Sequence, residues 1–287
     1  MLRNLALAAT AALSIAAAPP RQKCAPLRVM TYNIRLDLAE DGANRWSNRR
    51  DQFIGQIGLM HPAILGLQEV VPGQKADLQR AFPDFAFLGL PREEGGEAAN
   101  LAFDRNLFRL QSSGTYWLSP TPNVPSKGWD AAYSRVATWA HLVRKSDGRR
   151  FLVVNTHLDN EGKQARLEGA RQIAGWIAAN RVPGELVIMT GDFNTTPDSP
   201  PVQLLTSAPL SLRDARTISK TPAVGPEGTW NEFRAIPLPK DEMRIDFVLV
   251  DPKIDVERYG ALAWHFDGPR VASDHFPVVA DLNACRR

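Results

Sequence analysis

Carboxylate, amide and imidazole side chains interrupt apolar, strand-like segments at six places in the 287-residue sequence. The residues are Asn33, Glu69, His157 with Asp159, Asp192 with Asn194, Asp246, and Asp274 with His275. Burying such groups at strand ends costs free energy unless they are paired or bind something. The simplest common explanation is that all six places lie at one edge of the fold and form one site.

The chemistry of this set favours a hard cation. Oxygen donors with few histidines and no cysteine suit Mg²⁺, with Mn²⁺ or Ca²⁺ as alternatives, rather than Zn²⁺. Taken singly, an Asp that follows a strand is more often a turn residue or a helix cap. The hypothesis of a metal site therefore depends on the whole set and not on any one residue.

The elements that must position this set are read from the apolar pattern. Strands are expected at 27–34, 63–67, 101–103, 114–118, 136–143, 151–156, 186–190, 244–250 and 276–282. Helices are expected from a cap at Ser47 to Pro62, at 74–82 and at 161–180. Because strands predominate and helices follow only some of them, the pattern indicates one α/β domain with two sheets rather than a doubly wound parallel sheet.

Taken in order from Asn33 to His275, these motifs resemble the endonuclease/exonuclease/phosphatase superfamily over nearly the whole chain. The resemblance implies a catalytic domain over residues 27–284 with the fold of a four-layered α/β sandwich, in which two packed, mainly antiparallel mixed sheets are flanked by helices. It also implies a divalent-metal-dependent hydrolase, with Mg²⁺ as the usual ion, that cleaves a phosphodiester or phosphomonoester by in-line attack of water.

The resemblance leaves the substrate open. Nucleic acid is the leading class, and the alternative is a small or lipid phosphoester, as in the related sphingomyelinases and inositol-polyphosphate phosphatases. A catalytically inactive binding module on the same fold is an alternative of a different class. The presence of Glu69, Asp192, Asn194 and His275 argues against that module.

Roles for single residues are also implied by the resemblance. The catalytic residues would be His157, Asp192, Asn194, Asp246 and His275, the substrate-binding residues Arg135, Asn194 and His157, and the metal ligands Asn33, Glu69 and Asp274. Asp192 is similar to the acid that orients or deprotonates the attacking water, and Asn194 to the amide that positions it. His275 is similar to a catalytic histidine whose tautomer is fixed by a carboxylate, here Asp246.

Two further segments resemble a deadenylase-like, bacterial secreted branch of this superfamily. They are residues 113–119 and 126–130. Asp104 stands where that branch commonly has an aromatic residue, and Asn160 stands where a histidine is frequent. Neither departure removes a core catalytic residue, so both concern substrate contacts.

Residues 1–16 are typical of a secretory signal peptide, because Arg3 precedes an uncharged, mostly apolar run from Leu5 to Ala18. That run is shorter than the roughly 20 residues that span a bilayer, although a retained membrane anchor is the alternative. We expect an exported protein, periplasmic or extracellular, that is monomeric and not stably inserted in a membrane. The net charge of +3 neither excludes nucleic acid nor forms the basic stripe typical of its binders.

Export also changes the interpretation of the only two cysteines, Cys24 and Cys285. An even number of cysteines in an oxidising compartment favours a disulfide. If Asn33 ends the first strand and His275 precedes the last one at the same site, neighbouring strands here would be antiparallel. Cys24 lies 33 − 24 = 9 residues before Asn33, and Cys285 lies 285 − 275 = 10 residues after His275. We therefore predict a Cys24–Cys285 disulfide at the opposite end of the sheet.

Overall fold

The computed structural model describes residues 26–235 and 243–285, which form twelve strands and six helices. The strands are β1 (Leu27–Asn33), β2 (Ile64–Val70), β3 (Phe85–Leu88), β4 (Ala98–Asp104), β5 (Phe108–Trp117), β6 (Val136–Arg144), β7 (Arg150–His157), β8 (Leu186–Asp192), β9 (Arg213–Asp214), β10 (Asp246–Val250), β11 (Asp255–Ala261) and β12 (Val278–Asn283). The helices are the 3₁₀ helix η1 (Ala39–Asn44), α1 (Trp46–Met60), α2 (Pro72–Ala81), α3 (Lys163–Asn180), α4 (Pro200–Thr206) and α5 (Ala215–Ile218).

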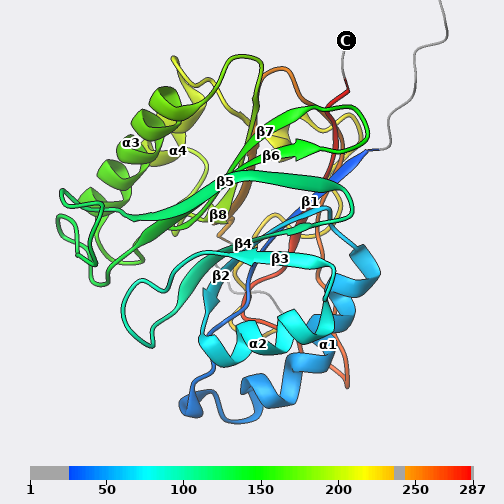
Figure 1. Ribbon diagram of the computed structural model, residues 1–287. Coiled ribbons are helices and arrows are strands. Elements are labelled where there is room, and N and C mark those ends of the chain that lie inside the picture. The colour runs from blue at the N-terminus through cyan, green and yellow to red at the C-terminus, as the bar shows by residue number, and fades with distance from the viewer. Residues whose placement is uncertain (1–25, 236–242, 286–287) are drawn as a thin grey trace, which may run out of the picture.

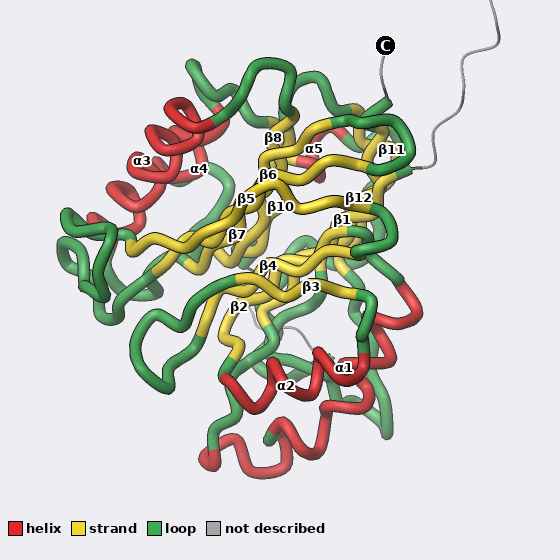
Figure 2. Tube along the Cα trace, viewed as in Figure 1, coloured by secondary structure: helices red, strands yellow, loops and turns green. Residues whose placement is uncertain are grey.

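The strands form two six-stranded sheets that pack against each other (Figure 1, Figure 2). The first sheet has the order β11-β12-β1-β2-β4-β3, and the second has the order β5-β6-β7-β8-β10-β9. Among the described strands, each sheet contains one parallel pair, β1–β2 or β7–β8, and its other neighbours are antiparallel. The expected pair of mainly antiparallel mixed sheets is confirmed.

Helices cover both outer faces, so the molecule has four layers (Figure 1). Helix α1 packs Phe53 and Ile57 on the first sheet, and helix α3 packs Ile173 and Ile177 on the second. Each pair is spaced four residues apart, which places both side chains on one face of a helix. A third apolar cluster fills the space between the sheets. The four-layered sandwich expected from the sequence is confirmed.

Some local expectations were wrong. Helix α1 begins at Trp46, and the preceding Arg45 makes no side-chain cap, so Ser47 lies inside the helix. The sequence also did not reveal β3 or β11. Strand β3 has only four residues, and β11 is an edge strand whose pairing with β12 is irregular between Val256 and Arg258. Short or interrupted edge strands lack the alternating pattern that identifies a strand in a sequence.

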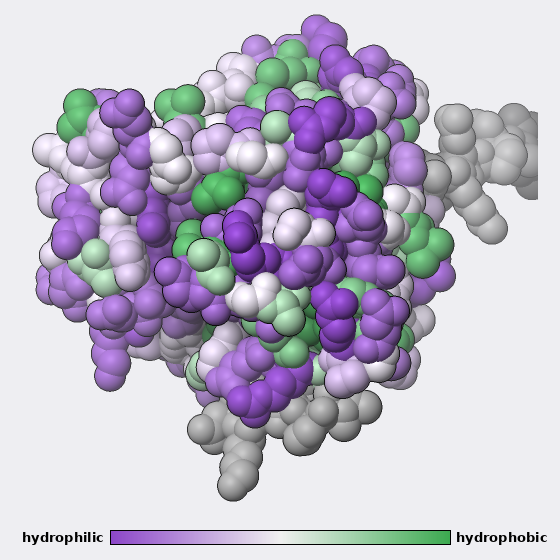
Figure 3. Space-filling view, turned by 90° about the horizontal axis from the view of Figure 1, so that it is seen from below, coloured by the Kyte–Doolittle hydropathy of each residue, from purple (hydrophilic) through white to green (hydrophobic). Residues whose placement is uncertain are grey.

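None of the helices in the described ranges has the length and apolar character needed to cross a bilayer. The face on the side of α1 and α2 is mostly hydrophilic, with hydrophobic residues dispersed in small groups (Figure 3). The predicted signal peptide, residues 1–16, lies outside the described residues.

The register of β1 and β12 makes the proposed disulfide testable. The two strands are antiparallel neighbours, as predicted, with Leu27 opposite Leu282. In an antiparallel pair, each step back along one strand matches a step forward along the other. An unbroken register would therefore place position 24, three residues before Leu27, opposite position 285, three residues after Leu282. Cys24 itself lies outside the described residues, and the bridge stays a prediction. Closing so long a loop stabilises a protein by up to about 5 kcal/mol.

We expect the non-reduced mature protein to show the mass deficit of one disulfide and to incorporate no alkylating reagent when unfolded without reductant. The same protein after reduction should incorporate two equivalents. Two alkylated thiols in the non-reduced, exported protein would contradict the prediction.

Candidate active site

The residues selected from the sequence lie at one edge of the sandwich, where β1, β2, β7 and β8 end and where β10 begins. In the second sheet, His157, Asp192 and Asp246 are direct cross-strand neighbours on β7, β8 and β10. In the first sheet, Asn33 at the end of β1 pairs with Gln68, next to Glu69. The strand register therefore brings together groups that are far apart in the sequence.

Asn33 joins the two sheets at this edge. Its Nδ2 donates hydrogen bonds of 3.0 Å to Glu69 Oε1 and 2.9 Å to Asp192 Oδ2. Its Oδ1 accepts a hydrogen bond from the Arg35 backbone N–H, which fixes the orientation of the amide. The other oxygen of Glu69, Oε2, accepts the Leu36 backbone N–H at 3.1 Å. One buried amide thus holds the carboxylates of both sheets side by side.

His275 and Asp246 form a buried pair beside Asp192. His275 Nδ1 lies 2.8 Å from Asp246 Oδ2, and His275 Nε2 lies 3.7 Å from Asp192 Oδ2. Burial by itself lowers the pKa of His275, but the negative charges of Asp246 and Asp192 outweigh it and raise that pKa well above its usual value. This shift favours the protonated ring, whose Nε2 faces Asp192.

A second histidine and carboxylate pair mirrors the first. Asn194 Nδ2 lies 3.0 Å from His157 Nε2 and also donates to the Leu158 carbonyl. His157 Nδ1 lies 3.4 Å from Glu97 Oε1, so the ring is held between an amide and a carboxylate. Glu97 was not selected from the sequence. It lies in the charged loop between β3 and β4, directly before an apolar strand rather than at the end of one, so no sequence signal distinguished it from a surface glutamate.

Two residues of the site have left-handed backbone conformations, which are uncommon outside glycine. Glu69 has φ of 63° and lies where the pairing of β2 with β4 shifts by one residue, between Leu67 and Val70. Asn194 has φ of 49°, and its backbone N–H donates to Asp192 Oδ1. Bulges and strained residues of this kind concentrate at functional sites because they redirect a side chain. Here the bulge directs Glu69 toward Asn33.

A buried polar layer between the sheets supports the site from below. Asn155 on β7 donates to the backbone carbonyls of Leu67 and Asn100 in the opposite sheet. Its Oδ1 accepts hydrogen bonds from Gln68 Nε2 and Thr190 Oγ1. A Cβ at Gly66 would lie 2.2 Å from Thr190 Oγ1, so only glycine permits this close approach. The layer fixes the position of one sheet on the other beneath the site.

The donors around Glu69 fit a divalent cation. Burial, together with the negative charge of Glu69, raises the pKa of Asp274 to about 6, although nearby cationic groups oppose it. Carboxylates that repel one another in a buried site have the charge and the oxygen donors that Mg²⁺ requires. Ligand atoms of Glu69, Glu97 and His157 lie within 4.8 Å of one another, as do those of Asp192, Asp246 and His275. The site thus has two groups of residues that could bind a metal.

Arg135 has a different environment from that expected of a phosphate ligand. It is buried, and its side chain donates to Glu97 Oε1, Asp159 Oδ2 and Asn160 Oδ1. Backbone N–H groups, chiefly that of Gly162, and Arg135 outweigh the effect of burial and lower the pKa of Asp159 to about 2. These contacts hold Glu97 beside His157, so the geometry gives Arg135 a positioning role. A direct contact with substrate stays a prediction.

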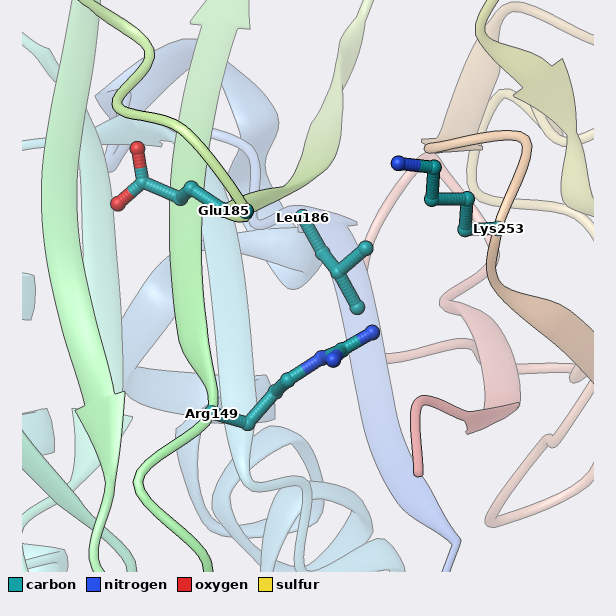
Figure 4. A pocket seen from close by; sticks show the side chains of 5 residues that line it. Arg149, Glu185, Leu186 and Lys253 are labelled. Atoms are coloured by element: carbon teal, nitrogen blue, oxygen red, sulfur yellow. The ribbon is translucent and has the colours of Figure 1, made fainter. Parts of the chain in front are cut away.

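A cavity of about 380 Å³ lies at the other end of the strands, where β7 and β8 begin. It is lined by Arg149, Gly184, Glu185, Leu186 and Lys253, and none of the site residues reaches it (Figure 4). Strands β7 and β8 separate this cavity from His157 and Asp192, at their far ends, by roughly 20 Å at about 3.3 Å per residue. The cavity is therefore separate from the candidate active site.

Comparison with known proteins agrees with this geometry. Residues 30–275 match the model of the Endonuclease/Exonuclease/phosphatase family. The chain is similar to the solved structure of a mannosyl-6-phosphatase from Bacteroides thetaiotaomicron, with 31% identity, coverage of 90% of this chain and 99% of that one, and a TM-score of 0.84. An endonuclease/exonuclease/phosphatase from Bacteroides vulgatus is 33% identical over 90% of this chain and 98% of that one, also with a TM-score of 0.84.

The curated relatives are less similar and are matched over only part of their length. A probable RNA exonuclease of Saccharomyces cerevisiae is 26% identical over a 210-residue alignment that covers 65% of this chain and 41% of that protein. An uncharacterized protein of Acanthamoeba polyphaga mimivirus is 27% identical over 161 residues, 53% of this chain and 60% of that one. The matches thus span less than two thirds of either relative.

Proposed function

The chain belongs to the endonuclease/exonuclease/phosphatase family, whose members are metal-dependent phosphoester hydrolases, and from this premise we propose that it hydrolyses a small phosphomonoester with the aid of Mg²⁺. The observation that carries the proposal is the contact of Asn33 with both Glu69 and Asp192. This contact places a cation-binding carboxylate of one sheet beside a proton-accepting carboxylate of the other.

Glu69 would hold the cation through a carboxylate oxygen, with Asn33 through its Oδ1 and Asp274 as the further ligands implied by the sequence. When bound, the cation neutralises charge on the phosphoryl oxygens. Asp192 is placed to orient the attacking water and to accept its proton as the new P–O bond forms and the bond to the leaving oxygen breaks. Its Oδ1 accepts the backbone N–H of Asn194, and its Oδ2, which accepts Asn33 Nδ2, faces the reaction centre. The residues thus align a nucleophile in a fixed, charged environment.

The two histidines flank the position of the phosphoryl group. His157 Nε2 and His275 Nε2 lie 3.5 Å and 3.7 Å from the same oxygen, Asp192 Oδ2. His275 holds a proton at Nε2, where it can stabilise negative charge on a phosphoryl oxygen in the transition state. Asp246 keeps the other ring nitrogen occupied, so the orientation of the ring is fixed.

The charge of the surrounding loops supports a small substrate. The described loops at this edge are residues 34–45, 89–97, 118–135, 158–162, 193–199, 226–235 and 264–275. They contain seven Lys and Arg and fourteen Asp and Glu, although the whole chain has a net charge of +3. A long nucleic acid needs several phosphate contacts from basic residues, and an acidic rim opposes them. A single phosphate bound through a cation does not need such contacts.

The relatives favour the same substrate class. The match to this chain covers 99% of the structure named as a mannosyl-6-phosphatase, but only 41% of the protein named as a probable RNA exonuclease. Nuclease activity, which the sequence placed first, is therefore our second candidate, and the yeast relative is the observation that favours it.

A substrate panel tests the proposal. Purified protein with Mg²⁺ should release phosphate from hexose 6-phosphates and glycerol phosphate faster than it cleaves oligonucleotides, sphingomyelin or an aryl phosphodiester. Because the carboxylates need a cation, EDTA should abolish hydrolysis and added Mg²⁺ should restore it. Unchanged activity in EDTA would contradict the metal-dependent mechanism. Oligonucleotide cleavage without phosphate release from sugar phosphates would contradict the substrate class in favour of nuclease.

We also propose that the chain is exported after cleavage of residues 1–16 and acts as a monomer. The uncharged apolar run that starts at Leu5 supports export. The amino-terminal sequence of the protein recovered from a periplasmic or culture fraction would reveal the cleavage point. An intact Met1 on the protein in that fraction would argue against cleavage.

A further inference from the structure

Tyr133 is an exposed aromatic side chain at the rim of the site. It lies on the loop between β5 and β6 and is 46% exposed. Three other exposed apolar side chains, Leu90, Val124 and Trp129, lie on the same loop or on the neighbouring loop that ends at Glu97. An aromatic ring that stays exposed to solvent contributes little hydrophobic stabilisation. Core packing therefore does not explain the presence of Tyr133 at this position.

Two arginines support the ring of Tyr133 from beneath. Arg92 Cζ lies 4.7 Å and Arg135 Cζ 5.6 Å from the ring centroid. Both guanidinium groups donate to the same oxygen of Glu97, Oε1, so they lie together on one side of the ring. The exposed part of Tyr133 therefore faces away from the protein. Cation–π contacts of this kind hold an aromatic ring in a defined plane.

The ring is also fixed with respect to the catalytic histidine. The backbone N–H groups of Ala132 and Tyr133 donate to the buried carboxylate of Asp159 at 3.0 and 3.1 Å. Glu97, which binds both arginines, lies 3.4 Å from His157 Nδ1. The carboxylate of Glu97 thus links the two arginines beneath the ring to His157, which in the proposed mechanism contacts the phosphoryl group. Because the ring is already held in place, little conformational entropy is lost from this side chain when a substrate binds to it.

We propose that Tyr133 is a platform on which the pyranose ring of a sugar phosphate stacks while its phosphoryl group lies between His157 and His275. The proposal rests on the function proposed above and makes Tyr133 a specificity-determining residue. The acidic rim favours a sugar over a nucleotide, since carboxylates such as Glu93 accept hydrogen bonds from sugar hydroxyl groups. They would repel the additional phosphates of an oligonucleotide or of a nucleoside di- or triphosphate.

The test compares a substrate with a ring and one without. For Tyr133→Ala, we expect KM for a hexose 6-phosphate to rise about tenfold with little change in kcat, because one aromatic contact is lost. Kinetic constants for glycerol phosphate, which has no ring, should stay unchanged. Tyr133→Phe should restore the KM for the hexose phosphate. Val124→Ala, at an exposed apolar position of the same loop, serves as the matched control and should leave both substrates unaffected.

Binding gives a readout that does not depend on turnover. In saturation-transfer NMR, the ring protons of the hexose phosphate should receive saturation from the wild-type protein and lose most of it with Tyr133→Ala. If Tyr133→Ala impaired the kinetic constants for the hexose 6-phosphate and for glycerol phosphate equally, Tyr133 would only support Arg92 and Glu97. That result would overturn the proposal. Absence of saturation transfer to the ring protons with wild-type protein would also overturn it. Hydrolysis of neither substrate would instead count against the proposed function, and the NMR result would still decide the role of Tyr133.

Discussion

We expect replacement of His275 with Asn to lower kcat by about a thousandfold, while the concentration of Mg²⁺ needed for half-maximal activity should change little. The side chain lies at 2.8 Å from Asp246 and holds a proton toward the centre of the site. Acid–base groups placed in this way contribute about 10² to 10⁴ in rate. An asparagine retains much of the volume but loses the imidazole proton, so steady-state kinetics with titrated Mg²⁺ separates loss of chemistry from loss of metal.

The matched control for this variant is His141→Asn. His141 lies on β6, is bound to Glu185 at 2.8 Å, and has no contact with the site. It tests whether loss of a partly buried, carboxylate-bound histidine is harmful in itself. We expect wild-type activity from His141→Asn. If His275→Asn retained more than about a tenth of wild-type kcat, the assignment of His275 to the chemical step would be wrong.

We expect replacement of Glu69 with Gln to weaken binding of Mg²⁺ by more than about a hundredfold, which exceeds the usual effect of losing a partner outside the ligand set. The change removes a negative charge and keeps the side-chain length and the contact with Asn33. The backbone strain at φ of 63° is the same for Gln, so the fold should be retained. Isothermal titration calorimetry with Mg²⁺, supported by activity at increasing Mg²⁺, measures the effect.

Glu161→Gln controls for the general loss of a negative charge at this edge. Glu161 is exposed on the loop after β7. Its replacement should shift the affinity for Mg²⁺ only slightly, since exposed charges are screened by solvent and salt. An equal loss of Mg²⁺ affinity in both variants would mean that the acidic rim as a whole, and not Glu69, attracts the cation.

Sequence patterns predicted those parts of the molecule that depend on repeated local features. Buried strands such as β8 are continuous apolar runs, and α3 repeats its apolar residues at helical spacing. The polar residues that end these strands marked the site edge, because a polar group in an apolar context has few structural uses. The antiparallel pairing of β1 with β12 followed from the positions of Asn33 and His275.

The remaining features depend on contacts between distant segments, which leave no local pattern. Glu97 lies in a charged loop and becomes part of the site only because β4 begins opposite β2 and beside β6. The one-residue bulge that redirects Glu69 follows from the register of β2 on β4. The polar layer around Asn155 exists because two sheets meet there. None of these features could be predicted without the arrangement of the sheets.

The central claim is that Glu69 and its neighbours hold one divalent cation between the two sheets. The most direct test is a crystal structure of the Mn²⁺-soaked protein with an anomalous difference map. We predict the strongest peak within about 2.3 Å of a Glu69 oxygen, adjacent to Asn33 and on the side of Asp192. A map in which the ordered Mn²⁺ ions lie away from Glu69, with only water beside its carboxylate, would contradict the account.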